Sequence, residues 1–149
     1  MSETNALLEK IVIEGDLGKL SPADRAAYYK QVCESLGITP WTRPLSYLVL
    51  NGRMVLYANK DCADQLRKRD SISIGKPDII FTDDLVTVSV DAHTADGRTD
   101  AEIGAVAIGG LKGDAKANAI MKALTKAKRR VTLSICGLGM LDETAAEPI

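Results

Sequence analysis

The sequence predicts an α+β fold in which antiparallel β-hairpins form a sheet backed by helices. One observation is Asn51-Gly52, a strong two-residue turn signal between the apolar runs at residues 45–50 and 53–59. Another is the alternation of apolar and polar residues over 85–94, followed by a turn and a second strand pattern over 98–108. Apolar residues also recur at helical spacing before, between and after these hairpins, and this spacing predicts the helices of the fold.

The composition is that of an ordinary soluble domain, with 149 residues of which 46% are hydrophobic and 26% charged. We expect an acidic, weakly ordered segment at residues 1–20, a single domain at 21–143 and a short tail at 144–149. The sequence contains no apolar run of membrane-spanning length and no basic-plus-apolar leader, which predicts a cytoplasmic protein without membrane contacts.

The cysteines are odd in number and far apart, at positions 33, 62 and 136. This spacing is typical neither of a zinc site nor of a disulfide framework. We therefore expect reduced, partly buried thiols.

The first helix is expected over residues 22–36. Ser21 is a favourable N-cap, Pro22 suits the first turn, and Gly37 follows the last apolar residue. The connector that follows, residues 38–44, contains two prolines and displays Trp41, the only tryptophan.

The Asn-Gly turn predicts the register of the first hairpin. It sets Val49 opposite Met54 and Leu48 opposite Val55, which makes both faces of the ribbon largely apolar. One face therefore needs a second cover, and a helix, a partner subunit and a ligand are the alternatives. We expect the hairpin to be partly buried between subunits.

A short helix is expected over residues 61–69, with Asp61 as its N-cap, before short strands at 71–74 and 79–81. Arginines near the end of this helix suit the helix dipole, and a second nucleic-acid contact is the alternative explanation for them.

The second hairpin is expected to turn at Asp96-Gly97. A two-residue loop there sets Val90 opposite Ile103 on an apolar face and Asp91 beside Glu102 on a polar face.

The longest helical pattern runs from Lys112 to Glu143 and ends in glycines and an acidic pair. Apolar residues at three- and four-residue steps predict one core-facing stripe, made of Ile120, Leu124, Ala127, Val131 and Ile135. Cations on the opposite side are expected to be exposed, namely Lys122, Lys126, Arg129 and Arg130. Residues 112–130 contain seven basic residues and one acidic residue, a net charge of +6 in a chain of net charge −1.

This charge asymmetry favours a polyanionic partner, because a basic stripe on a rigid helix can follow phosphates. A solvated helix face without a partner is the alternative. The six aromatic residues are scattered along the sequence and do not predict a base-stacking platform. We therefore expect contacts to the phosphate backbone that are independent of base sequence.

Enzyme motifs are mostly missing. The glycine-rich residues 109–114 lack the Gly-Lys-Ser/Thr sequence that cradles phosphates, and the sole histidine, His93, is expected to be an exposed strand residue opposite Asp100. One alternative is Pro77-Asp78 followed by Asp114-Ala115-Lys116, which is similar to PD-(D/E)xK nucleases, where two carboxylates hold Mg²⁺. Asp114 is better explained as the N-cap of the long helix, so we expect no catalytic residue, no metal and no cofactor.

The segment TKAKRRVTLSICG at residues 125–137, with Asp142-Glu143 beyond it, resembles the closing motif of Erf-type phage annealing proteins. That motif is a Thr-x-Ala-[KR]-Arg helix that ends in glycine before acidic residues. The segment is also similar to the corresponding helices of the RecT and Redβ (Bet) recombinases and of the eukaryotic annealing mediator. It departs from the Erf pattern at Arg130 and Cys136, where aromatic residues are usual.

A second region resembles the front end of RecT and Bet proteins, in which a helix runs through a turn into a hairpin and another helix. The matching residues are Cys33-x-x-x-Gly37-x-x-Pro40, Tyr47-x-Val49, Asn51-Gly52-Arg53 and the helix at 63–69.

The resemblance implies ATP-independent binding of single-stranded DNA and annealing of complementary strands in phage recombination, inside a bacterial host cell. It also implies an oligomeric ring or filament and no cofactor. The implied partners are single-stranded DNA, the annealed duplex, further copies of the chain, and a phage exonuclease or host single-strand-binding protein. A nucleic-acid-binding scaffold that does not anneal is the main alternative.

The expected DNA-binding residues are the cations of the long helix, arginines of the first hairpin and the short helix, and the tryptophan of the connector. They are Lys112, Lys116, Lys122, Lys126, Lys128, Arg129, Arg130, Arg53, Arg67, Arg69 and Trp41. For Trp41, a subunit boundary and an anchor in the core are the alternatives.

Overall fold

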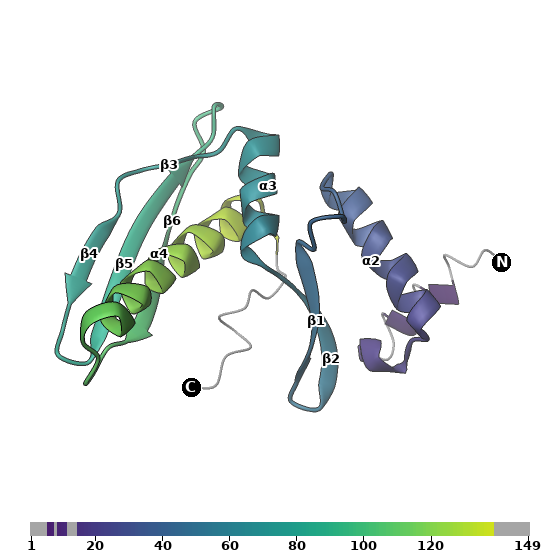
Figure 1. The fold of residues 1–149 in the computed structure, drawn as a ribbon. Coiled ribbons are helices and arrows are strands. Elements are labelled where there is room, and N and C mark those ends of the chain that lie inside the picture. The colour runs from purple at the N-terminus through teal and green to yellow at the C-terminus, as the bar shows by residue number, and fades with distance from the viewer. Residues whose placement is uncertain (1–5, 8, 12–14, 139–149) are drawn as a thin grey trace. The chain divides into compact units, whose positions relative to one another are not determined.

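The computed structural model describes residues 6–7, 9–11 and 15–138, and these form two compact units. One unit ends at Cys62 and the other begins at Ala63, so the single domain expected over residues 21–143 spans parts of both (Figure 1). Asp142-Glu143 and the tail at 144–149 lie outside the described residues. The α+β class is confirmed, with antiparallel sheets and a long helix in the last part of the chain.

The first unit contains the 3₁₀ helix η1 (Leu17–Lys19) and the helix α2 (Pro22–Leu36). The expected caps of α2 are confirmed, since Ser21 Oγ accepts a hydrogen bond from the Asp24 amide at 3.1 Å and Gly37 is left-handed with a φ of 68°. The segment before α2 differs from the expected weak order at 15–20, because Leu17 and Leu20 are buried.

Asp16 joins η1 to the hairpin. Its carboxylate accepts hydrogen bonds from the backbone amides of Met54 and Gly18, each at 2.9 Å. These two bonds to the charged form hold the pKa of Asp16 below its usual range.

The hairpin consists of β1 (Leu45–Leu50) and β2 (Arg53–Ala58), and its expected register is confirmed. The face that carries Tyr47 packs on α2, where the Tyr47 hydroxyl donates to the carbonyl of Arg25 at 2.6 Å. Strand alternation directs Leu48 to the other face, where it is half-buried.

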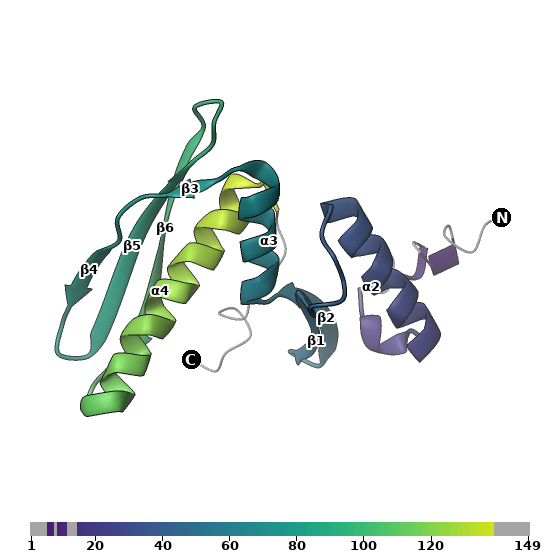
Figure 2. The same cartoon turned by 45° about the horizontal axis from the view of Figure 1, so that its top comes forward.

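The helix α3 (Lys60–Asp70) contains the boundary between the units in its first turn, and Asp61 lies inside that turn rather than at the N-cap. The sheet of the second unit then follows with β3 (Ser73–Ile74), β4 (Asp78–Phe81), β5 (Leu85–His93) and β6 (Thr99–Ala107). The strand β5 is central, with β3 and β4 along one edge and β6 along the other (Figure 2).

The register expected for β5 and β6 is wrong by one residue. Val90 lies opposite Glu102, not Ile103, and His93 lies opposite Thr99, not Asp100. The loop has three residues, because the Thr94 amide donates to the Arg98 carbonyl at 2.9 Å and Gly97 has a φ of 91°. A one-residue shift moves every β6 side chain to the opposite face.

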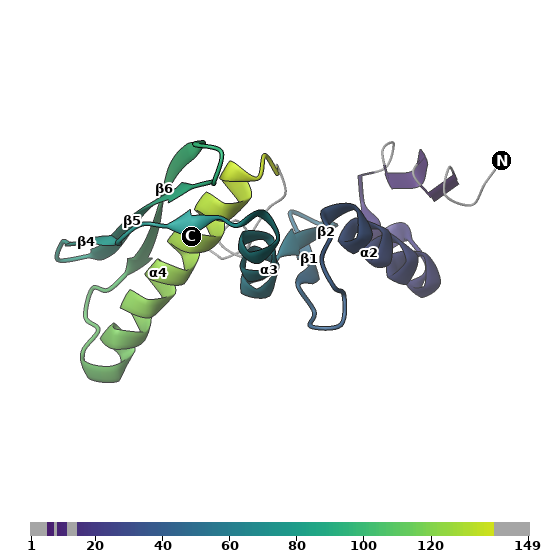
Figure 3. The same ribbon diagram turned by 90° about the horizontal axis from the view of Figure 1, so that it is seen from above.

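The helix α4 (Gly113–Ile135) covers one face of this sheet in all views (Figure 3). Lys112 is its N-cap residue, so Asp114 lies in the first turn and is not the N-cap. The helix ends at Ile135, and Gly137 follows in the left-handed conformation. Its buried apolar residues pack against alternate residues of β5 in one core, which contains Val86, Val88, Val90, Ala92, Ala119, Ala123, Ala127, Val131 and Ile135.

Gly104 of β6 lies directly under α4. A Cβ atom at this position would lie 2.5 Å from both the Ala123 carbonyl oxygen and the Ala127 amide nitrogen. The backbones of helix and strand therefore approach closely, and small residues on both sides make this possible. Within the residues that the structure describes, no helix combines the length and the apolar character needed to cross a membrane.

Candidate nucleic-acid interface

The cations of α4 differ sharply in exposure along the helix. Lys112, Lys116 and Lys122 in the first half are exposed, whereas Lys126 and Arg129 are only 6% and 3% exposed. The expectation that Lys126 and Arg129 lie on a solvent-exposed face is therefore wrong.

Lys126 and Arg129 are buried because the face of α4 that packs on the sheet is rotated about the helix axis from the apolar stripe that the sequence predicts. Ala119 and Ala123 belong to the buried core, and the Cβ atom of Lys126 lies 2.9 Å from where a Cβ at Gly104 would be. Alanine is only weakly hydrophobic, so helical periodicity places the centre of the predicted stripe at the larger residue Leu124 and not at the alanines. Arg129 has an interaction partner in the structure, as buried charges require.

The last part of α4 is held on β6 by polar contacts. Arg130 forms an ion pair with Glu102 of β6 at 3.3 Å, and the hydroxyl of Ser134 donates to the carboxylate of Asp100. Both acidic residues face the helix because of the one-residue shift in register. Arg130 thus contributes to packing, although part of its side chain remains exposed.

Lys128 and Arg67 meet between α3 and α4. Arg67 donates to the Lys128 carbonyl at 3.4 Å and to Thr132 Oγ1 at 2.7 Å, and it forms an ion pair with Asp64. Burial lowers the pKa of Arg67 from its usual value, although Asp64 opposes this shift. Arg67 is therefore directed inward, whereas the neighbouring Arg69 is exposed and binds the Asp70 carboxylate through two hydrogen bonds of 2.7 and 2.6 Å.

The first half of α4 presents its charge to solvent. Lys116 Nζ lies 5.7 Å from the centroid of the Phe81 ring, which holds that charge beside an exposed aromatic surface. The helix N-terminus carries the positive end of the helix dipole, and Lys112 makes no side-chain cap there. Lys112 and Lys122 are ten residues apart, a rise of about 15 Å along a helix.

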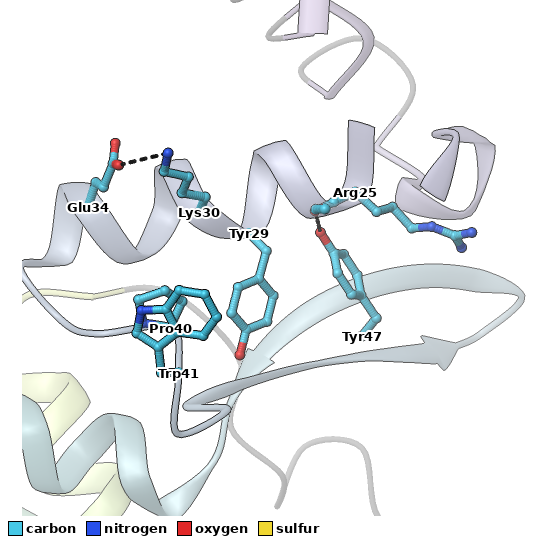
Figure 4. A pocket seen from close by; sticks show the side chains of 8 residues that line it. Arg25, Tyr29, Lys30, Glu34, Pro40, Trp41 and Tyr47 are labelled. Atoms are coloured by element: carbon cyan, nitrogen blue, oxygen red, sulfur yellow. Dashed lines mark hydrogen bonds and ion pairs between the residues drawn. The ribbon is translucent and has the colours of Figure 1, made fainter. Parts of the chain in front are cut away.

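Arg53 and Trp41 belong to the first unit. Arg53 is exposed at the start of β2, and Trp41 is 90% exposed, which contradicts the alternative that Trp41 is an anchor in the core. Trp41 lines an apolar groove together with residues that the sequence did not single out as a site, including Tyr29, Tyr47 and Lys30 (Figure 4). The α2 residues of this groove lie at four-residue steps, for example from Arg25 to Tyr29 and from Lys30 to Glu34, which is the sequence signal of a shared helix face.

The residues of the alternative nuclease pattern do not come together. Asp78 lies opposite Ser89 on the sheet face that points away from α4, whereas Asp114 is in the first turn of α4. In the described part of the chain, no group of three or more metal-binding side chains is present. His93 is exposed as expected. Cys33 and Cys62 are buried, Cys136 is half-buried, and none of the three forms a disulfide.

Comparison of the chain with protein-family models and with curated protein sequences found no match.

Proposed function

We propose that the protein binds single-stranded DNA without base-sequence preference and anneals complementary strands without ATP, as an oligomer in phage recombination. The observation that carries the proposal is the cluster of exposed lysines on the first half of α4, which we call the α4 lysines: Lys112, Lys116 and Lys122. A rigid helix with exposed cations near its positive dipole end attracts phosphates. The resemblance of residues 125–137 to the Erf motif supports annealing in particular.

Burial of Lys126 and Arg129 changes how the motif contributes to this function. The motif residues hold α4 in place, and the phosphate contacts come from the preceding turns of the same helix. Arg53 and Arg69 add exposed positive charge outside α4, and the Asp70 carboxylate offsets part of the charge of Arg69.

Replacing all three α4 lysines by alanine is expected to weaken binding of single-stranded DNA for all base sequences alike. If each lysine contacts one phosphate, the slope of log affinity against log salt falls by about 0.7 per contact, or roughly 2 in total. Fluorescence anisotropy with labelled oligonucleotides over a series of salt concentrations measures this slope. Far-UV circular dichroism checks that the variant remains folded.

A matched control removes the same charge elsewhere, through Lys10→Ala, Lys19→Ala and Lys76→Ala at exposed positions. This control should keep most of the parent slope, since it tests net charge rather than position. Equal slopes for the parent and the α4 lysine variant would contradict the proposed site. Strand pairing without ATP tests annealing itself: a protein that binds without pairing strands is a scaffold, and Mg²⁺-dependent cleavage identifies a nuclease.

Assembly into an oligomer is the second part of the proposal and is supported by the hairpin. Val49 near the turn is 65% exposed and Leu48 is on the face directed away from α2. Leu48→Lys is expected to reduce oligomer size in sedimentation, because a charge in an apolar interface costs several kcal/mol unless it is paired. Ala27→Lys on the exposed side of α2 is the control. Unchanged sedimentation of the Leu48 variant would place the interface elsewhere.

A further inference from the structure

An apolar groove of about 630 Å³ lies in the first unit, between α2, the connector and β1 (Figure 4). Its volume is in the range of roughly 300–1,000 Å³ that is typical of pockets for small organic ligands. Three of the six aromatic residues of the chain line it, namely Tyr29, Trp41 and Tyr47. The structure thus brings together rings that are separated in the sequence.

The two tyrosines are fixed in place. Tyr29 donates its hydroxyl proton to the Leu45 carbonyl at 2.9 Å and accepts from the Leu45 amide at 3.0 Å. Tyr47 donates to the Arg25 carbonyl at 2.6 Å, and the ring centroids of Tyr29 and Tyr47 are 6.2 Å apart. Burial raises the pKa of Tyr47 to about 12, so its hydroxyl remains a neutral donor. Both hydroxyls are therefore occupied by the protein, and the ring surfaces remain for a ligand.

The connector at residues 38–44 fixes the backbone of Trp41 and leaves its side chain exposed. Trp41 lies in a turn closed by the Arg43 amide, which donates to the Pro40 carbonyl at 3.2 Å, and the neighbouring Thr42 hydroxyl donates to the Asp61 carboxylate. The Trp41 side chain is 90% exposed on this anchored turn, so the face of its ring is accessible to a ligand.

Two cations and one carboxylate of α2 line the groove, namely Arg25, Lys30 and Glu34. Arg25 donates to Met54 Sδ at 3.5 Å, and Lys30 lies 3.9 Å from Glu34 in an exposed ion pair that is weak. Aromatic faces combined with flanking cations fit a nucleobase with its phosphates, since any base can stack on an aromatic ring. An uncharged apolar peptide would use the rings but not the cations.

We propose that this groove, which we call the Trp41 groove, binds unpaired bases of a single strand by stacking them on Trp41. The inference rests on the proposed DNA-binding function and adds a second contact to it. This contact distinguishes unpaired bases from paired ones. Phosphates are present in single and double strands alike, but only an unpaired base offers its face to a side chain. The Trp41 groove therefore gives the protein its preference for single strands.

The test compares a thymine oligonucleotide with an abasic oligonucleotide of the same length, which keeps the phosphates and lacks the bases. Trp41→Ala in the full chain is expected to weaken binding of the thymine oligonucleotide about 5- to 140-fold and to leave binding of the abasic one unchanged. Trp41→Phe should recover most of the loss because it restores an aromatic face. Ile103→Ala, which removes an exposed apolar side chain on the sheet face directed away from α4, should change neither.

The fluorescence of Trp41, the only indole, provides an independent reading in the parent protein. We expect quenching by the thymine oligonucleotide and none by the abasic one. An equal loss of affinity for both oligonucleotides in Trp41→Ala would overturn base stacking, even if DNA binding by the α4 lysines is confirmed. If the Trp41 fluorescence changes with protein concentration and not with added DNA, Trp41 lies in a contact between copies of the chain. That result would also overturn base stacking. A parent protein that binds through Trp41 but does not anneal refutes the annealing function alone.

Discussion

Gly104→Ala is expected to lower the free energy of unfolding by about 3 kcal/mol, because the added methyl group overpacks the contact between β6 and α4. The added Cβ would lie 2.5 Å from two backbone atoms of α4, the Ala123 oxygen and the Ala127 nitrogen. Neither atom belongs to a flexible side chain, so the whole helix must move away from β6. Chemical unfolding followed by far-UV circular dichroism measures the loss, because Trp41 fluorescence reports on the first unit.

The control for this change is Gly109→Ala. The nearest atom to a Cβ at that position is Asp84 Oδ1 at 3.5 Å, an ordinary contact distance. We expect a change within about ±0.5 kcal/mol there. If both variants unfold at the same denaturant concentration, α4 does not lie as close to β6 as the structure shows.

Arg129→Ala is expected to destabilise the protein by roughly 2–4 kcal/mol, in contrast to a neutral surface substitution. The side chain is 3% exposed and has an interaction partner, so its removal leaves a cavity in a packed region and takes that interaction away. The matched variant is Lys122→Ala on the same helix, which is exposed and should change stability by no more than about 0.5 kcal/mol.

In DNA binding the order of the two variants should be reversed, with Lys122→Ala showing the larger effect and Arg129→Ala the smaller one. Lys122→Ala is expected to reduce the salt dependence of binding, whereas Arg129→Ala, measured where it is fully folded, should keep the parent salt slope. A stable Arg129→Ala variant with a reduced slope would show that Arg129 contacts phosphates and that its burial is not maintained in solution.

Local turn chemistry explains which parts of the fold were predictable. The Asn51-Gly52 turn allows one short loop geometry, and the register of β1 and β2 was predicted correctly from it. Asp96-Gly97 is compatible with both a two-residue and a three-residue loop, and the structure has the three-residue form. The apolar pattern did not decide between the two registers, because Ile103 in one and Val106 in the other both supply an apolar residue to the core face.

Prediction of the candidate site failed where the exposure of a residue depends on contacts distant in the sequence. Helical periodicity locates a face of α4, but the close approach at Gly104 decides how far the buried surface extends toward Lys126. In the same way, no helical or strand period relates the positions of Tyr29, Trp41 and Tyr47 in the sequence. The packing of β1 on α2 brings these residues to one groove. The charge pattern therefore located a basic helix but predicted the exposure of only some of its cations correctly.

The two proposed sites lie in different units, the Trp41 groove in the first and the α4 lysines in the second, so a protein that used both would be a bivalent binder. Once one site holds a strand, the other meets the same strand at a high effective concentration, and avidity can exceed either affinity by roughly 10²–10⁴. An oligonucleotide that reaches only one site gains nothing from the other. Affinity should therefore rise in a step as the oligonucleotide is lengthened, and the length at that step measures the separation of the two sites in solution.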